Sequence, residues 1–272
     1  MKTPPPPDLH IARAPGDISD RRDGRFLVFV GIVLVALALG FKSELVAPGQ
    51  VWGLGAGLLI LAFPALLGYL RTDEGLPAVE NFIPVAIGAV AIAGLSTFAM
   101  DWWKFDVLVA VFGLGFVISG WLDHRRLRER EKPGHVVLQE TVMVLAMAAA
   151  FLVVLTVNLP LPLRLGWIFA ISTLATYRSF RSLGRVMPPR RAFLFSVFVA
   201  QLVTFFSWAA IVYLSYQEGP MAAILVFLWY VNRGIIRHTV EETLTRNVLV
   251  EYGLFVLLLA YLFIASQTPH PG

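Results

Sequence analysis

The sequence predicts an all-α fold, a polytopic transmembrane helical bundle of about nine spans. Three observations predict it: an apolar composition, recurring long apolar segments, and basic residues concentrated in alternate loops. Of the 272 residues, 57% are hydrophobic and 15% are charged, and the mean hydropathy is +0.73. A water-soluble domain keeps about a quarter of its residues charged to cover its surface, whereas a bilayer lets apolar side chains face outward. The composition therefore excludes an ordinary soluble domain.

Nine apolar segments account for most of the chain. About 20 helical residues cross a hydrocarbon core of about 30 Å, and most of the segments reach or approach that length. They cover residues 25–41, 51–70, 82–99, 105–122, 138–157, 165–180, 192–215, 220–236 and 248–266. The sixth and eighth are marginal and need snorkelling ends or local thinning of the bilayer. We therefore expect one transmembrane helical domain over residues 25–266, with the number of spans correct to within one.

Basic residues determine the expected orientation, because loops rich in lysine and arginine are retained in the cytoplasm. If the N-terminus is cytoplasmic, nineteen of the 22 Lys and Arg residues fall on the inner side, and only Lys42, Lys104 and Arg164 fall outside. The sequence therefore predicts a multi-pass protein with its N-terminus inside and its C-terminus outside. The expected location is a cell membrane, with a bacterial inner membrane favoured. No nucleic-acid partner is expected, since the basic residues form short runs between apolar segments.

Both ends of the chain lie outside the predicted spans. Residues 1–24 are rich in proline and mixed charges, cannot bury a core and are predicted to form a disordered cytoplasmic tail. Residues 267–272 form a short outer tail. The small residues Ala36-Leu37-Ala38 at the end of the first apolar run leave open a cleaved signal peptide. The acidic residues before this run are unlike a compact positive n-region, so an uncleaved first helix is favoured.

A weak repeat marks the points where helices return to the inner side. These points, at Arg71, His124, Arg178 and Arg233, are separated by 53, 54 and 55 residues. Four helical hairpins followed by a final helix would give this spacing. Ancient duplication is one explanation. Hairpins with short loops produce similar intervals without a common ancestor, and this is the favoured interpretation.

Few residues are suited to chemistry inside the membrane, where an ionisable side chain is costly and is a functional hypothesis by default. No predicted span carries one at its midplane. Charged residues near the predicted surfaces, where water or headgroups solvate them, are Asp101, Lys104, Asp106, Glu140 and Glu251. This placement argues against ion-coupled transport. The chain has no cysteine, and its five histidines lie in predicted tails or loops, so we expect no metal and no cofactor.

The densest polar cluster lies at the inner junction of the last two predicted spans. Its charged members are Arg233, Arg237, Glu241, Glu242, Arg246 and Glu251, which form the candidate site, with no catalytic residue assigned. One interpretation is a helical extension of the eighth span. In it, ordinary i,i+4 ion pairs join Arg237 to Glu241 and Glu242 to Arg246. The other is a cytoplasmic-face site at which the three arginines bind an anionic headgroup or a partner protein.

Glu241-Glu242-x-x-x-Arg246 resembles the first motif of the CAAX-type prenyl endopeptidases and their bacterial relatives. Those proteins are membrane proteases in which paired glutamates activate a catalytic water. The resemblance covers six residues. In that family later helices supply further histidines, whereas here only one predicted span follows and the sole histidine beyond it is His270. Because those partners are missing, the family is not assigned.

Two functions from different classes follow. The preferred one is a non-enzymatic integral membrane protein, either an accessory subunit of a membrane complex or a carrier of a lipid-like molecule. The alternative is a membrane-embedded enzyme that acts on a lipid substrate at the cytoplasmic face, with Glu241, Glu242 or Glu251 as base. Convergence of Glu140, Glu242 and Glu251 in one cavity would favour the enzyme. The expected partners are the lipid bilayer and either a membrane protein or a lipid-like ligand.

Overall fold

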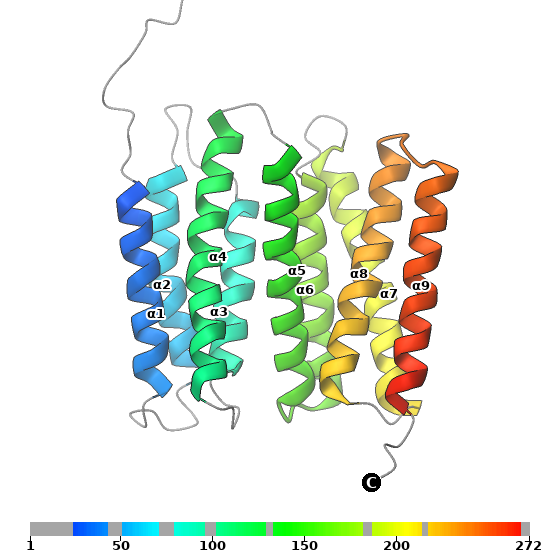
Figure 1. Ribbon diagram of the computed structural model, residues 1–272, viewed down its shortest axis with the longest axis horizontal. Helices are drawn as coiled ribbons and strands as arrows, with labels where there is room; N and C mark the ends of the chain where they lie inside the picture. Colours follow the sequence, from blue (N-terminus) through cyan, green and yellow to red (C-terminus); the bar gives the residue numbers. More distant parts are fainter. Residues whose placement is uncertain are drawn as a thin grey trace, which may run out of the picture.

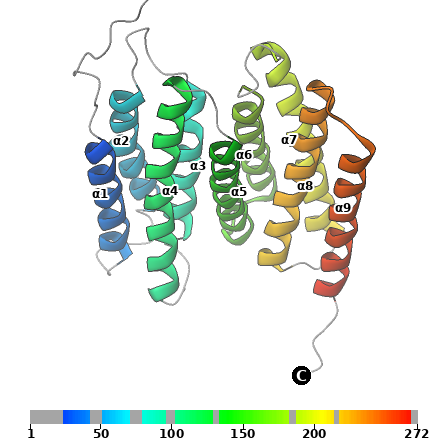
Figure 2. The same cartoon turned by 45° about the horizontal axis from the view of Figure 1, so that its top comes forward.

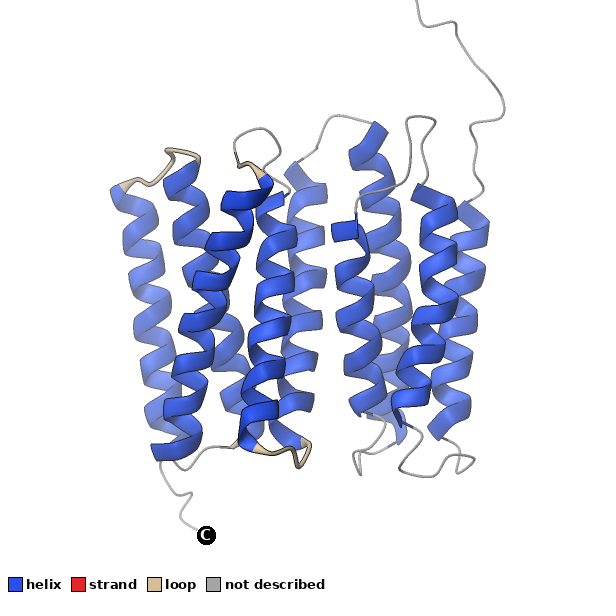
Figure 3. Ribbon diagram, turned by 180° about the vertical axis from the view of Figure 1, so that it is seen from behind, coloured by secondary structure: helices blue, strands red, loops and turns tan. Residues whose placement is uncertain are grey.

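The computed structural model describes residues 24–42, 51–70, 79–95, 102–128, 133–181, 187–213 and 217–267. Over these residues the chain is all-helical, without a strand, which confirms the predicted class (Figure 3). The elements are α1 (Gly24–Lys42), α2 (Val51–Leu70), η3 (Val79–Phe82, a 3₁₀ turn), α3 (Ile83–Leu95), α4 (Trp102–Arg128), α5 (Pro133–Thr156), α6 (Leu161–Arg181), α7 (Pro189–Tyr213), α8 (Glu218–Val240) and α9 (Arg246–Gln267). The predicted tails lie outside the described residues, except for Gly24 and Gln267, which belong to helices.

Each predicted apolar segment lies on one of the nine described α-helices. Three helical stretches in this part of the chain are long and apolar enough to cross a membrane, namely Val137–Thr156, Pro189–Tyr213 and Glu218–Val240. Four shorter apolar stretches lie in α1, α2, α3 and α4. The eighth segment, marginal by its predicted length, is therefore among the long ones. The shortest helix is α3, with 13 residues. These helices indicate association with a membrane.

The helices stand side by side in two rows (Figures 1 and 2). In the first row α1 packs on α4, α4 on α5, α5 on α8, and α8 on α9. In the second row α2 packs on α3, α3 on α6, and α6 on α7. Successive helices alternate in direction, so α2, α4, α6 and α8 all end at the same face of the bundle (Figure 1). The start of α5 lies at that face too, which brings polar residues from several helices to one level.

Two apolar cores hold the rows together. The first is built mainly by α1 to α4, around Leu34, Leu58 and Leu66, and the second mainly by α5 to α8, around Phe151 and Trp229. Helices α3 and α5 join the cores, because each contributes to both. At their crossing a Cβ added to Gly94 would overlap the side chain of Val153. The small residue therefore permits the close approach of the two helices.

Candidate functional site

The end of α8 sets the geometry of the predicted site. The backbone N–H of Thr243 donates to the carbonyl of His238 at 2.9 Å, and that of Glu242 donates to Thr239 at 3.3 Å. This pair of hydrogen bonds is a Schellman motif, which places its C′ residue in the left-handed region. Glu242 occupies that position with φ 55°. The helix therefore ends at Val240, and a turn separates it from α9.

The turn affects the two predicted i,i+4 ion pairs differently. Arg237 and Glu241 are joined, with 3.3 Å between Nε and Oε1. Glu242 and Arg246 lie on either side of the break in the helix, and both are exposed. Within the described residues, no ion pair joins them. The resemblance to the prenyl endopeptidases therefore falls on a turn in which one glutamate is held by an arginine and the other faces outward.

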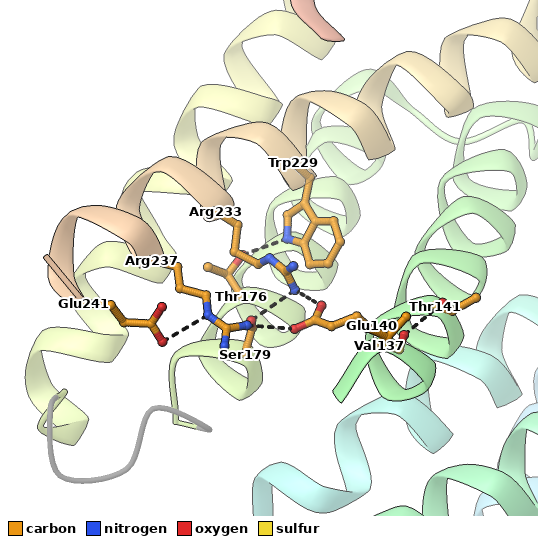
Figure 4. A network of polar contacts seen from close by, with 9 residues as sticks. All are labelled: Val137, Glu140, Thr141, Thr176, Ser179, Trp229, Arg233, Arg237 and Glu241. Atoms are coloured by element: carbon orange, nitrogen blue, oxygen red, sulfur yellow. Dashed lines mark hydrogen bonds and ion pairs between the residues drawn. The ribbon is translucent and has the colours of Figure 1, made fainter. Parts of the chain in front are cut away.

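Arg233 points into the bundle, toward Glu140 on α5 and Ser179 on α6 (Figure 4). It is only 4% exposed. Its Nη1 donates to Glu140 Oε2 on α5 and to Ser179 Oγ on α6, the latter at 3.0 Å. The guanidinium carbon lies 4.8 Å from the ring centre of Trp229 and 5.2 Å from that of Tyr230, within the range of cation–π attraction. Its Nε is buried without a hydrogen-bond partner among the described residues.

Glu140 links this buried arginine to the end of α8. While Oε2 accepts from Arg233, Oε1 lies 3.5 Å from Nη1 of Arg237. Arg237 also pairs with Glu241, so the charges alternate from the interior to the turn (Figure 4). Trp229, one turn before Arg233 on α8, donates a 2.8 Å hydrogen bond from its Nε1 to Thr176 Oγ1 on α6. Both carboxylate oxygens of Glu140 are therefore engaged by arginines.

A second cluster lies beside the first. Arg178 on α6 donates through Nη2 to both carboxylate oxygens of Asp123 on α4, at 2.9 and 3.1 Å. Gln139 on α5 donates to the same carboxylate at 2.7 Å. Asp123 is 2% exposed and Arg178 is 6% exposed. Gln139 precedes Glu140 and Arg178 precedes Ser179, so adjacent residues of α5 and α6 serve the two clusters.

We call the two clusters together the polar belt, which comprises Asp123, Gln139, Glu140, Arg178, Ser179, Arg233, Arg237 and Glu241. Its three carboxylates match its three guanidinium groups. Burying an ion is expensive, and removing one partner of a buried pair leaves an uncompensated charge that costs about 3–5 kcal/mol. Removal of a charge from the buried part of the belt, such as Asp123, is therefore expected to be destabilising, and the belt ties α4, α5, α6 and α8 together at one face of the bundle.

The structure brings together half of the predicted site residues. Arg233, Arg237 and Glu241 join the belt, whereas the side chains of Glu242, Arg246 and Glu251 are exposed and make no hydrogen bond or ion pair within the described part of the chain. The sequence placed Arg233 among the inner-side cations but did not indicate that it is buried. It also placed none of the following residues in the candidate site: Asp123, Gln139, Arg178, Ser179, Thr176 and Trp229.

One signal for the missed residues was present in the sequence. The interval of 53 to 55 residues between helix returns also separates residues that touch. Asp123 and Arg178 are 55 apart, and Ser179 and Arg233 are 54 apart. Thr176 and Trp229, joined by a hydrogen bond, are 53 apart. Polar residues at this interval therefore marked contacts between the even-numbered helices.

The carboxylates expected of an enzyme do not converge. Glu140 is bound in the belt, and Glu242 and Glu251 are exposed. In the described residues no group of three or more His, Asp or Glu side chains is placed to hold a metal ion. Within the described residues, Glu140, Glu242 and Glu251 therefore do not form one site.

Two open grooves are lined almost entirely by apolar side chains. One, of about 550 Å³, lies between α8 and α9, with Ile235 and Leu249 near its end at the turn. The other, of about 610 Å³, lies between α2, α3 and α6, where the rings of Phe63 and Phe82 are in contact, tilted by 33°, with their centres 4.4 Å apart. Neither groove contains an ionisable carboxylate. Both suit apolar chains rather than polar substrates.

Comparison with protein-family models, with curated proteins and with solved structures finds no match for this chain. The geometry of the belt and of the grooves is therefore the basis for the function proposed below.

Proposed function

We propose that the chain is a polytopic integral membrane protein of nine spans that works without catalysis and binds or carries a lipid-like molecule. Its N-terminus is cytoplasmic and its C-terminus lies outside, in a cell membrane, with a bacterial inner membrane favoured. The side-by-side array of helices supports the nine spans, and the unequal division of lysine and arginine between alternate loops supports the orientation.

The outward faces of the helices support a lipid environment. Large apolar side chains are exposed along the array, including Ile60, Phe205 and Leu257. Apolar surface left in water forgoes about 25 cal/mol per Å² of stabilisation, whereas acyl chains cover such surface. The distribution of these residues over many helices is typical of a lipid-facing surface rather than of a single binding patch.

The observation that carries the non-catalytic function is that the carboxylates of the polar belt are paired with arginines, while the grooves between helices are lined by apolar side chains. Asp123 and Glu140 are held by arginines, so neither is available to take a proton from a substrate. The grooves between helices offer apolar walls suited to an acyl or prenyl chain. This favours a lipid-like ligand over an accessory role, in which the chain would only contact other membrane proteins.

The proposal is tested by purifying the protein in native-lipid nanodiscs and identifying by mass spectrometry what stays bound. A retained lipid-like molecule supports the carrier. A stoichiometric protein partner without such a ligand would replace the carrier with an accessory subunit. The purified protein is also incubated with its host lipids, beside the variant Glu242→Gln. A lipid product that forms with wild type and is lost in the variant would show that the chain is an enzyme instead.

A further inference from the structure

The groove between α8 and α9 runs toward the turn that joins them. Val231 and Ile235 line one wall, and Leu249, Gly253 and Leu257 line the other. Tyr252 lies across α8 at Gly234, where an added Cβ would overlap the phenol, so the two helices approach closely there. A Cβ at Gly253 would meet nothing within 4 Å, so the groove is open in front of this residue.

An unpaired cation stands at the end of this groove. Arg246, the first residue of α9, is exposed and has no ion-pair or hydrogen-bond partner for its side chain among the described residues. At 100° per residue, Leu249, Gly253 and Leu257 lie within about 60° of Arg246 around the helix axis. Arg246 therefore lies on the groove-facing side of α9, at the end of the helix nearest the turn.

The acidic residues nearby do not occupy this position. Glu251 lies about 140° from Arg246 around the axis of α9. Glu241 is paired with Arg237, and Glu242 precedes the helix in the turn. His238, whose Nδ1 lies 2.9 Å from Thr243 Oγ1, adds a second nitrogen-bearing side chain on the facing end of α8. The groove is thus lined by apolar side chains along its length, and basic residues lie near its end at the turn.

We propose that this groove binds a membrane phospholipid with an anionic headgroup, with an acyl chain between α8 and α9 and the phosphate at Arg246. The inference rests on the proposed membrane topology, which places the turn at the cytoplasmic face beside the inner leaflet. Arginine is suited to the phosphate because its planar donors bind two oxygens at once. The apolar wall accounts for a lipid rather than free phosphate, which has no chain to fill the groove.

The test uses the full chain in nanodiscs made from equal amounts of phosphatidylglycerol and phosphatidylcholine. After transfer to detergent, the retained lipids are measured by native mass spectrometry. Wild type is expected to retain phosphatidylglycerol in preference to phosphatidylcholine, because the choline ammonium offsets the phosphate charge of phosphatidylcholine, whereas phosphatidylglycerol keeps a net negative charge. Arg246→Ala is expected to lower that preference about fivefold, the effect of one cation near an anionic surface. Gly253→Leu, whose side chain enters the open groove, is expected to lower retention of both lipids.

Matched controls separate this site from general lipid contact. Arg191, in the first turn of α7, is like Arg246 an exposed arginine at the predicted inner face, but it lines neither groove. Arg191→Ala should therefore leave the preference for phosphatidylglycerol unchanged. Gly166→Leu places a side chain in open space on α6 and should leave retention unchanged. Arg246→Lys should retain part of the preference. Size-exclusion chromatography of every variant confirms that it is folded.

Two results would overturn the proposal. One is that wild type retains the two lipids in the proportion in which they were supplied, which would mean that it binds annular lipid only. The other is an equal loss in the variants and in their controls. Cysteine labelling from each side of the membrane, performed on the same preparations, distinguishes the possible failures. A nine-span labelling pattern without selective lipid retention would remove the site and leave the membrane topology intact.

Discussion

Individual side chains show how arginines are accommodated in the apolar interior. Arg178 and Arg233 are buried, and each is held by a carboxylate from a different helix. Charge counting assigns both arginines to the predicted inner side, because that prediction depends only on position along the chain. It could not predict which arginines turn inward, because this depends on the direction of each side chain around its helix. For this reason the sequence placed Arg233 in the candidate site without indicating that its side chain is buried.

The Asp123–Arg178 pair provides a direct test at this scale. Asp123→Asn removes the charge but keeps the shape, and takes this carboxylate from the buried guanidinium of Arg178. We expect a loss of about 3 kcal/mol in the free energy of unfolding, measured by denaturation in detergent micelles. Asp106→Asn, on the exposed start of α4, is the matched control and should have little effect. Replacing Asp123 and Arg178 together with leucine should recover most of the loss; an additive loss would contradict the pairing.

Glu242 provides a test of backbone conformation. With φ 55°, it occupies a region that glycine adopts without the steric penalty of a side chain. Glu242→Gly should therefore stabilise the end of α8, raising the free energy of unfolding by about 1 kcal/mol. Glu242→Ala keeps the Cβ and removes the carboxylate, which separates the backbone effect from the charge. If both variants gain equally, the gain comes from the charge and not from the left-handed conformation.

Whole helices were more predictable than their ends. Hydropathy located every described α-helix, since each needs a long apolar run, but it does not mark where backbone hydrogen bonding begins or stops. The apolar segment 82–99 begins as the 3₁₀ turn η3 and continues as α3, which ends at Leu95. Conversely, α4 continues to Arg128, beyond the apolar segment that ends at residue 122, because arginine and histidine residues tolerate a helix well.

The crossing of α3 and α5 provides a prediction for packing between helices. Gly94→Ala should push the helices apart, because the new Cβ would overlap Val153, and should cost about 1–3 kcal/mol in a thermal-unfolding assay. Gly166→Ala, with no atom near its Cβ position, is the control and should be neutral or slightly stabilising. Val153→Ala should partly rescue the Gly94 variant. Without such a rescue, this contact would not set the distance between α3 and α5.

For the molecule as a whole, alternation of direction was predictable and the two-row arrangement was not. Basic loops alternate with poorly charged ones, which indicates antiparallel neighbours. The rows depend on which face of each helix meets protein. Because lipid and protein interior are both apolar, helix faces that contact them differ little in hydrophobicity. The polar belt indicates more clearly than hydrophobicity which helix faces meet protein, because its residues pair with one another across α4, α5, α6 and α8.

The orientation of the array is tested by single cysteines, for which the natural chain, lacking cysteine, is a ready background. Asn158→Cys and Gln217→Cys, in exposed turns at the predicted outer face, should react with a membrane-impermeant maleimide added to intact cells. Arg190→Cys and Leu244→Cys, at the opposite face, should react only after the membrane is opened. A reversed pattern would invert the topology, and labelling of all four from outside would rule out a membrane array with these faces.

The equal numbers of carboxylates and guanidinium groups in the polar belt also bear on how this protein can change over evolutionary time. A substitution that removes Asp123 or Glu140 takes a carboxylate from a buried guanidinium, so these positions tolerate change mainly when a paired position alters with them. Related sequences should therefore show covariation between positions 123 and 178 and among positions 140, 233 and 237. Positions 242 and 251, whose carboxylates face outward, should vary independently of all of them.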